Sequence, residues 1–283
     1  MENLIEKLPR LQRDGQLARA LIYELLSKTG LGHLFNFKTQ GVRLKMFPSD
    51  MTSEAFKSPA TYRSGDKAFL EQVLNPGALV VDVGANIGLI SIRSAKLVGN
   101  SGRVIAIEPN PKIAPFLQEN VRLNGLNNVT VFQTALGAKE GVTPFNCDRR
   151  DDCSRIIEKG GITVPMTTLD KVMEIEPTRD IDLLKIDVEG YEFVVLEGAS
   201  KSLKRTKLIY IEVDAANYAI YGRRTEEMTE LLEANGFDTF ISDENGNWHS
   251  VTGVITGCAN VIGKRRQESL AANASSPAPA SQS

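Results

Sequence analysis

An apolar run that ends in an acidic residue and a glycine-containing turn constrains the fold of this 283-residue chain more than any other feature. The run covers 79–83, and Gly84 and Gly88 follow it where helix-like spacing begins. A buried strand that leads into a tight turn and a helix places backbone N–H groups and the positive helix end at the strand's carboxyl edge. The pattern therefore predicts a site for a polar, nucleotide-like ligand at that edge.

The spacing of the glycines argues against a dinucleotide as this ligand. Asn86 stands where the dinucleotide fingerprint has its second glycine. A second acidic residue, Glu108, closes the next apolar run, and an acid at the tip of the second strand can accept hydrogen bonds from both hydroxyls of a ribose. Asp82, Gly84, Gly88 and Glu108 together indicate S-adenosylmethionine, and they disfavour the alternative of an NAD-dependent oxidoreductase.

The chain between about 66 and 215 alternates strand-like and helix-like segments, which predicts a mostly parallel sheet with helices on both faces. The end of the domain is expected to be an antiparallel hairpin, with arms at 237–242 and 248–262. The expected strands are 79–83, 103–108, 129–133, 183–187 and 208–212. The expected helices are 66–74, 87–98, 111–124, one beginning near 191, and 225–234.

Three regions follow from this organisation. Residues 1–65 are expected to be a helical extension with a cap or loop, 66–263 the main domain, and 264–283 a disordered tail that lacks large apolar residues. Leucines at helical spacing run along the first 30 residues and make a homodimer plausible; they are Leu4, Leu8, Leu11, Leu17, Leu21 and Leu25. Residues 41–64 are expected to form a short strand and a loop that covers the ligand.

Composition restricts the classes of function. The net charge is −2 and no dominant basic face is visible, so nucleic acid is not favoured as the main partner. Three cysteines without a C-x-x-C pair indicate a reducing compartment and argue against structural zinc. No apolar run approaches the roughly 20 residues of a membrane span, and the first residues do not resemble a signal peptide. We therefore expect a cytoplasmic protein.

Carboxylates gather at the predicted carboxyl ends of the strands, at Asp82, Glu108, Asp187 and Glu212. Ligands of open α/β sheets bind outside these ends. A structural role as a helix cap is the alternative for each acid, but four such caps would be a coincidence. Asp187, Glu189 and Glu192 lie close together in the sequence and are expected to concentrate negative charge at one point of the cleft. This charge could raise the pKa of one carboxylate toward that of a general base, hold a hard cation, or bind a cationic or hydroxyl-rich substrate.

Lys185 lies inside an otherwise apolar strand, where an unpaired charge is costly to bury. We expect it to pair with Asp187 or Glu212; the alternative is that it lies at an exposed strand edge.

Five segments of the chain together carry a family resemblance, at 76–88, 108–111, 135–137, 168–170 and 185–192. Over roughly residues 66–240 the chain resembles the FkbM-family methyltransferases. The resemblance implies a Rossmann-like, class I methyltransferase fold with a mostly parallel seven-stranded sheet and an antiparallel last strand. It also implies S-adenosylmethionine as cofactor and methylation of a hydroxyl on a sugar, glycan or secondary metabolite. The most specific part of the resemblance is Lys185-Ile186-Asp187-Val188-Glu189-Gly190.

The resemblance also assigns cofactor contacts. Gly84, Asn86 and Gly88 would hold the methionine side, Glu108 the ribose, and the Thr134–Ala135 segment would lie near the adenine. Asp82 and Asp187 are expected to complete the cofactor site. The acceptor is expected to contact the Tyr62–Arg63 loop, the 140–168 insertion, Tyr218 and Tyr221.

Removal of the hydroxyl proton requires a base or a metal. We expect Asp187 or Glu189 to be the base or the ligand of a divalent cation, with Glu212 as the next candidate and Lys185 as an associated charge. His33 and His249 are expected to be surface residues. Two alternatives stay open: an RNA or other nucleic-acid methyltransferase, disfavoured because Asp187-Val188-Glu189-Gly190 lacks the prolines of the amine-methylating motif, and a non-catalytic scaffold that keeps the fold.

Overall fold

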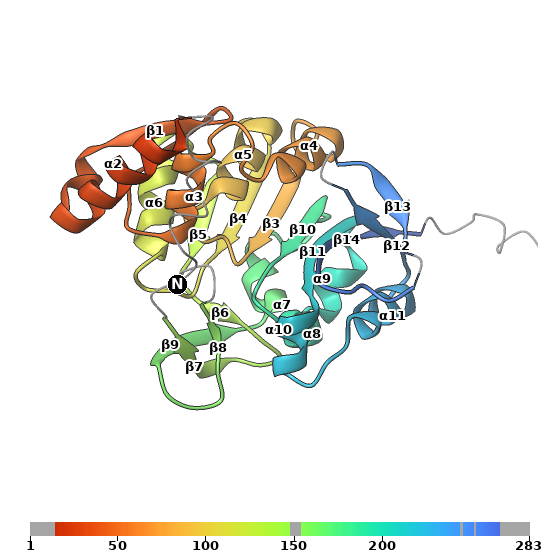
Figure 1. Ribbon diagram of the computed structural model, residues 1–283. Helices are drawn as coiled ribbons and strands as arrows, with labels where there is room; N and C mark the ends of the chain where they lie inside the picture. Colours follow the sequence, from red (N-terminus) through yellow and green to blue (C-terminus); the bar gives the residue numbers. More distant parts are fainter. Residues whose placement is uncertain (1–14, 148–153, 244–245, 252, 267–283) are drawn as a thin grey trace, which may run out of the picture.

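An eight-stranded sheet in the order β13-β12-β14-β11-β10-β3-β4-β5 forms the centre of the protein (Figure 1). The computed structural model describes residues 15–147, 154–243, 246–251 and 253–266. Strands β5, β4, β3, β10 and β11 are parallel, and β14, β12 and β13 are antiparallel. The strands are β3 (Leu79–Val83), β4 (Arg103–Ile107), β5 (Val129–Phe132), β10 (Leu183–Ile186), β11 (Leu208–Asp214), β12 (Phe237–Ser242), β13 (Trp248–Ser250) and β14 (Cys258–Arg265).

The central strands β3 and β10 are buried on both faces, which is why apolar residues fill all but one position of each. Along β3, Leu79, Val81 and Val83 enter one core, whereas Val80 enters the other. Because successive side chains of a strand point to opposite faces, one short run supplies both cores.

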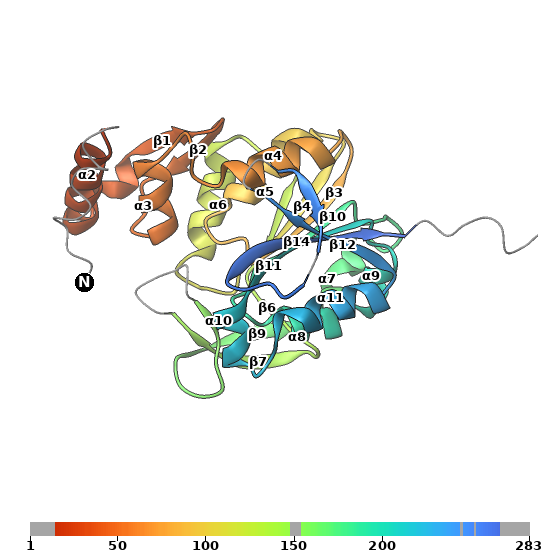
Figure 2. The same ribbon diagram turned by 45° about the vertical axis from the view of Figure 1, so that its right-hand side comes forward.

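Helices cover both faces of the sheet, as Figures 1 and 2 show from two directions. One face carries α4 (Ser64–Val73), α5 (Leu89–Val98) and α6 (Ala114–Leu123). The opposite face carries α7 (Leu169–Val172), α8 (Glu192–Glu197), α9 (Ser200–Lys204), α10 (Ala215–Ile220) and α11 (Thr225–Ala234). This is the Rossmann-like architecture expected from the sequence, with the short β13 added at one edge.

The carboxyl-terminal strands differ in detail from the expected hairpin. β12 pairs with β13 through Ser242 and Trp248, but this second arm ends at Ser250. The chain then returns as β14, which inserts between β11 and β12 and pairs with both. The last strand is thus antiparallel, as predicted, but it is an interior strand and not the sheet edge.

The first described residues form α2 (Gln16–Thr29), the 3-10 turn η1 (Leu31–Leu34), the hairpin β1 (Asn36–Thr39) with β2 (Val42–Lys45), and α3 (Asp50–Lys57). The expectation of a loop over 41–64 was wrong for α3. This helix begins at Ser49, whose side chain accepts a hydrogen bond from the Thr52 N–H at 3.0 Å, and Ala55 on its inner face is buried.

Helix α2 leaves large apolar side chains in solvent. Leu21 and Leu25 are each 63% exposed, and the helix contains no buried residue. A homodimer through this helix stays a prediction. The leucines expected at positions 4, 8 and 11, and most of the expected tail, lie outside the described residues. Among the described residues no helix is both long enough and apolar enough to span a membrane.

The insertion between β5 and β10 forms a second, four-stranded sheet in the order β6-β9-β7-β8 (Figure 1). Its strands are β6 (Ala135–Leu136), β7 (Gly141–Asn146), β8 (Arg155–Ile156) and β9 (Ile162–Thr167). The Tyr221 hydroxyl donates to the Ile156 carbonyl at 2.6 Å and ties this sheet to the loop after α10.

One buried amide fastens the β1–β2 hairpin to the main sheet region. Asn120 of α6 is fully buried, accepts from the Lys45 N–H at 2.9 Å and donates to the Ile87 carbonyl at 2.9 Å. Its side chain therefore links the hairpin, α6 and the turn that follows β3.

Replacing Asn120 by Ala leaves the Lys45 N–H and the Ile87 carbonyl without this partner. We expect Asn120→Ala to lower the free energy of unfolding by about 2–3 kcal/mol, because buried polar groups that lose a hydrogen bond are not resolvated. Urea unfolding followed by circular dichroism measures this loss. The control, Asn127→Ala, removes an exposed amide and should change the stability by less than about 0.5 kcal/mol. Equal stabilities of the two variants would contradict this account.

Candidate functional site

A cavity of about 390 Å³ opens at the carboxyl ends of the parallel strands. Its walls come from the turn after β3, the end of β4, the loop after β10 and Glu212 of β11. Helix α3, the start of α4 and the insertion sheet complete the walls. Residues far apart in the sequence meet here because parallel strands bring their ends to one edge of the sheet.

The turn after β3 requires glycine at two positions. Gly84 has φ +75°, and a Cβ built on it would lie 1.8 Å from the Asp187 carbonyl oxygen. Gly88 has φ +90°, and its Cβ would lie 2.4 Å from Cδ1 of Leu117. Any larger residue would therefore separate the turn from β10 or from α6. The turn therefore forms part of the cavity wall, which Gly84, Ala85 and Asn86 line.

Glu108, at the end of β4, is held by two backbone donors. Its Oε2 accepts from the Asn86 N–H at 2.9 Å and its Oε1 from the Asn110 N–H at 2.8 Å. The side chain lines the cavity although the residue is only 6% exposed. Burial raises the pKa of Glu108 to about 7, against the lowering effect of these two hydrogen bonds. The carboxyl group is thus fixed in direction and changes its charge near neutral pH.

Lys185 of β10 is buried and neutralised from two sides. Its Nζ lies 3.2 Å from Oδ1 of Asp82 and 3.4 Å from Oδ2 of Asp187, and it donates to the Gly84 carbonyl at 2.9 Å. The expected pairing with Asp187 is present, whereas Glu212 is not among its ion-pair partners. Asp82 has no exposed surface, accepts from Ser91 Oγ at 2.5 Å and does not line the cavity.

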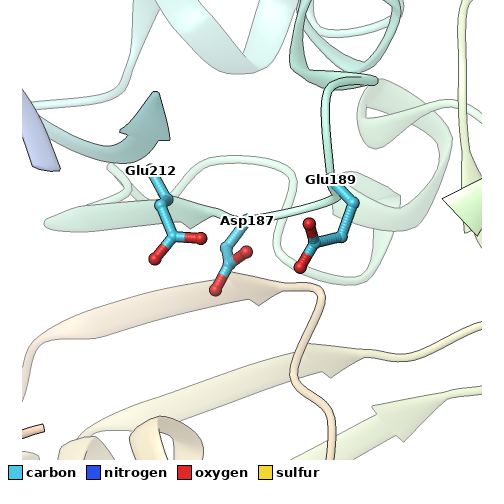
Figure 3. A group of neighbouring side chains, drawn as sticks. All are labelled: Asp187, Glu189 and Glu212. Carbon is cyan, nitrogen blue, oxygen red and sulfur yellow. The ribbon is translucent and has the colours of Figure 1, made fainter. Parts of the chain in front are cut away.

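Asp187, Glu189 and Glu212 point toward a common space at the strand ends (Figure 3). One carboxylate oxygen of each lies within 4.8 Å of the other two. Burial alone would raise the pKa of Asp187, but the neighbouring cations Lys185 and Arg63 lower it below its usual value. The charge of Asp187, together with burial, raises the pKa of Glu212 to about 8. The two neighbouring carboxyl groups thus differ in the direction of their pKa shifts because Asp187 faces the cations and Glu212 faces Asp187.

Glu192 holds the turn that carries Asp187 and Glu189. It is the last residue of the Lys-Ile-Asp-Val-Glu-Gly-Tyr-Glu segment. Its Oε1 accepts from the Val188 N–H at 3.0 Å and from the Gly190 N–H at 3.3 Å. Glu189, between these two donors, has φ +58° and bonds to Asn217 Nδ2 at 2.6 Å. Glu192 therefore shapes the turn that carries Asp187 and Glu189, and it does not join their acidic cluster as the sequence had suggested.

Arg63 enters the cluster from the start of α4. Its Nη2 lies 3.5 Å from Oδ2 of Asp187 and 3.9 Å from Oε1 of Glu212, and its Nη1 lies 3.3 Å from Oδ2 of Asp66. The prediction that the Tyr62–Arg63 loop lies at the site matches this position, since both residues line the cavity.

Most residues proposed for the site from the sequence come together in the cavity wall. Thr134, Gly88 and Asp82 do not line it, and Thr134 instead donates to the Pro165 carbonyl at 3.1 Å. Those that line it are Gly84, Asn86, Glu108, Ala135, Lys185, Asp187, Glu189 and Glu212.

Two of the expected acceptor contacts have other positions. Tyr218 is fully buried against Phe193, with ring centroids 5.1 Å apart, and belongs to the core. Tyr221 holds the insertion sheet and does not line the cavity. His249 is exposed and pairs with Asp243, in keeping with the surface role expected for it.

Sequence reasoning missed several lining residues. Met51 and Glu54 belong to α3, and the Ser49 cap was the local signal for this helix. Tyr191 lines the cavity from the turn next to Glu192. Arg155 lines it from the 140–168 insertion, for which the sequence analysis named no single residue.

Comparison with known proteins places this geometry in context. A family model described as "Methyltransferase FkbM domain" matches residues 82–239, more than half of the chain. A second model, described as "Protein-L-isoaspartate(D-aspartate) O-methyltransferase (PCMT)", matches residues 7–146. Both matches include the turn after β3 and Glu108.

Curated relatives are similar at low identity. The hexuronic acid methyltransferase AglP of Haloferax volcanii is 27% identical over 175 residues, covering 61% of this chain and 68% of that protein. The 2-O-methyltransferase NoeI of Sinorhizobium fredii is 24% identical over 180 residues, covering 56% and 73%.

The match to the ribosomal protein L11 methyltransferase of Caldanaerobacter subterraneus is shorter. It is 41% identical over 68 residues, covering 24% of this chain and 21% of that protein. The chain thus matches about a fifth of that relative's length. Among solved structures, a SAM-dependent methyltransferase from Aquifex aeolicus covers 76% of this chain and 97% of its own, at 20% identity and a TM-score of 0.44.

The buried ion pairs of Lys185 predict a large effect of removing its charge. Lys185→Met leaves Asp82 buried without its cation, which we expect to lower the free energy of unfolding by about 3–5 kcal/mol. Lys207→Met is the matched control, because Lys207 pairs with Asp182 at 2.9 Å on the surface and should contribute less than about 1 kcal/mol. Urea denaturation of both variants measures the difference. A loss below about 1 kcal/mol for Lys185→Met would refute the view that this pair is essential to the fold.

Proposed function

Because the chain belongs to the FkbM methyltransferase family, we propose that it transfers the methyl group of S-adenosylmethionine to a hydroxyl oxygen of a sugar, glycan or secondary metabolite. The observation that carries the proposal is the close pair Asp187 and Glu212, with carboxylate oxygens within 4.8 Å of each other, in the wall of the cavity that the glycine turn and Glu108 also line. One cavity thereby offers a cofactor cradle and a proton acceptor.

The residues present fit the cofactor. The side-chain-free backbone at Gly84 suits a close ligand, and the fixed Glu108 carboxylate suits two vicinal hydroxyls of a ribose. Ala135, which the family resemblance assigns to the adenine, lines the same cavity. When bound, S-adenosylmethionine supplies a methyl group already activated by a positively charged sulfur.

The work left to the protein is to orient the acceptor and to remove its proton. A general base is most effective when its pKa lies near the working pH. Glu212, with a pKa of about 8, meets this condition better than Asp187, whose pKa is lowered. We assign Glu212 as the group that receives the hydroxyl proton, and Asp187 as the charged neighbour that makes Glu212 basic enough. The other charged or titratable groups that interact with Glu212 are Arg63, Lys185, Glu189, Tyr210 and Cys258.

The relatives support oxygen as the acceptor atom and a sugar as one acceptor class. The name of NoeI states a 2-O-methyltransferase, and that of AglP states a hexuronic acid as substrate. Matched monosaccharide acceptors, methyl β-glucuronide and methyl β-glucoside, are therefore the first substrates to test with the purified protein.

Cofactor binding should depend on the charge of Glu108. A carboxylate accepts hydrogen bonds from both ribose hydroxyls, whereas the protonated acid does not, so the affinity for S-adenosylhomocysteine should fall as the pH drops below about 7. Calorimetric titration measures this. Glu108→Gln should weaken binding at pH 8 at least about tenfold, corresponding to about 1.4 kcal/mol, and should remove the pH dependence. The exposed Glu140→Gln is the control.

Unchanged affinity in Glu108→Gln would contradict the ribose assignment. Absence of S-adenosylhomocysteine binding by the wild-type protein would favour the non-catalytic scaffold.

Methyl transfer should rise with pH, with a midpoint near 8, because Glu212 must be ionised to accept a proton. Glu212→Gln should lose about 10²–10⁴-fold in kcat and the pH dependence with it. Asp187→Asn removes the charge that raises the pKa of Glu212, so its residual activity should have a midpoint at lower pH. Transfer from radiolabelled S-adenosylmethionine, measured across pH 6–10, gives these profiles.

Glu197→Gln, an exposed carboxylate on α8, is the control and should keep the wild-type profile. A profile that is flat between pH 7 and 9, or an Asp187→Asn variant with an unmoved midpoint, would exclude Glu212 as the base.

A further inference from the structure

The acidic cluster Asp187–Glu189–Glu212 has the spacing of a site for a hard cation. One oxygen of each carboxylate lies within 4.8 Å of the others (Figure 3). Calcium binds oxygen ligands at about 2.3–2.6 Å, so ligands on opposite sides of the ion are separated by about 5 Å. Three carboxylates this close repel one another unless positive charge lies among them.

Positive charge is already supplied by a side chain of the protein. The Arg63 guanidinium contacts Asp187 at 3.5 Å and Glu212 at 3.9 Å through the same nitrogen, Nη2. Its side chain is 25% exposed, which places the charge in a partly desolvated position where ion pairs are stronger than at the surface. Asp187 in addition faces Lys185, whereas Arg63 is the cation that forms an ion pair with Glu212 among the described residues.

The backbone holds Arg63 in an unfavourable conformation to reach this position. Its φ is +51°, in the left-handed region that costs a residue with a side chain about 1–2 kcal/mol. The buried Arg93 donates to the Arg63 carbonyl at 3.0 Å and to Gln40 Oε1 at 2.9 Å, which fixes the strained residue to the β1–β2 hairpin. Strain of this kind persists where the surrounding structure determines the conformation, and it concentrates at functional sites.

The other terminal nitrogen of the Arg63 guanidinium, Nη1, also has a carboxylate partner. Nη1 of Arg63 lies 3.3 Å from Oδ2 of Asp66, and the other oxygen of Asp66 accepts from the Tyr210 hydroxyl at 2.8 Å. The planar fork of an arginine therefore joins Asp66 on one side to Asp187 and Glu212 on the other. Such a fork fixes carboxylates in direction, which a hydrated lysine ammonium does less well.

We propose that the guanidinium of Arg63 takes the place of a divalent cation in this cluster, so that Arg63 positions Asp187 and Glu212 and the protein works without a bound metal. The statement about methyl transfer rests on the function proposed above; the statement about cation binding does not. Arg63 is a positioning residue in this view, because it acts through the two carboxylates.

Two substitutions separate charge from shape. Arg63→Gln removes the charge and leaves a polar side chain, and Arg63→Lys keeps the charge. Arg122→Ala, an arginine on α6 whose side chain is 75% exposed, is the control. The probe is Mn²⁺ alone, whose free concentration is followed by its electron paramagnetic resonance signal in titrations of the full-length protein. Circular dichroism establishes that each variant is folded.

We expect Arg63→Gln to bind one Mn²⁺ at least tenfold more tightly than the wild-type protein does, because the cluster has lost its internal cation. Adding Glu189→Gln to this variant should abolish the gain, which locates the ion in the cluster. Arg63→Lys and Arg122→Ala should bind Mn²⁺ no better than wild type. If the role of Arg63 were only structural, its replacement by Gln would not create a new Mn²⁺ site.

The wild-type protein gives a second, independent readout. Its methyl transfer should be unaffected by EDTA, Arg63→Gln should lose about 10²-fold in kcat, and Mn²⁺ should restore part of that loss. Specific Mn²⁺ binding by the wild-type cluster, a requirement for metal in the wild-type reaction, or an Arg63→Gln variant without increased Mn²⁺ affinity would each overturn the proposal. If no acceptor is methylated, the proposed function fails, and the Mn²⁺ titrations still decide whether Arg63 fills the cation position.

Discussion

The ion pairs of Lys185 are the interaction on which the geometry of the site depends. Lys185 lies in the central strand β10, and its ammonium joins Asp82 of β3, the carbonyl of Gly84 and Asp187. A buried lysine is tolerated only with such partners. The same contacts place the glycine turn beside the acidic cluster. The approach is so close that the Asp187 carbonyl leaves no room for a side chain at position 84. These contacts thus hold the glycine turn and the acidic cluster in a fixed relative position.

The carboxyl groups near Lys185 differ in pKa because their surroundings differ. Asp187 faces two cations and has a lowered pKa, while Glu212 faces Asp187 and has a raised one. Glu108, bound by backbone amides, has a pKa near 7 because it is buried. A pair of neighbouring acids with separated pKa values can keep one charge and exchange one proton. We propose that these differences in pKa, and the position of Arg63, adapt a common fold to the transfer of a methyl group to a weakly acidic hydroxyl.

The sequence predicted the parts of the fold that depend on local patterns. The five parallel strands β3, β4, β5, β10 and β11 match the strands expected from largely apolar runs, and the meeting of Glu108, Asp187 and Glu212 in one cavity follows from their parallel order. Non-local features were beyond its reach. The insertion of β14 between β11 and β12 depends on pairing across the sheet, and the partnership of Lys185 with Asp82 joins residues a hundred positions apart. Helix α3 was missed although its Ser49 cap is a local signal.

The most direct test of the central claim is a crystal structure of the protein with S-adenosylhomocysteine. We predict that the ribose hydroxyls lie within hydrogen-bonding distance of the Glu108 carboxylate. The sulfur should lie on the side of the cavity lined by Asp187 and Glu212, with the Lys185 ion pairs retained. A ligand bound elsewhere, or one whose sulfur is turned away from the acidic cluster, would contradict the assignment of this cavity as the site of methyl transfer.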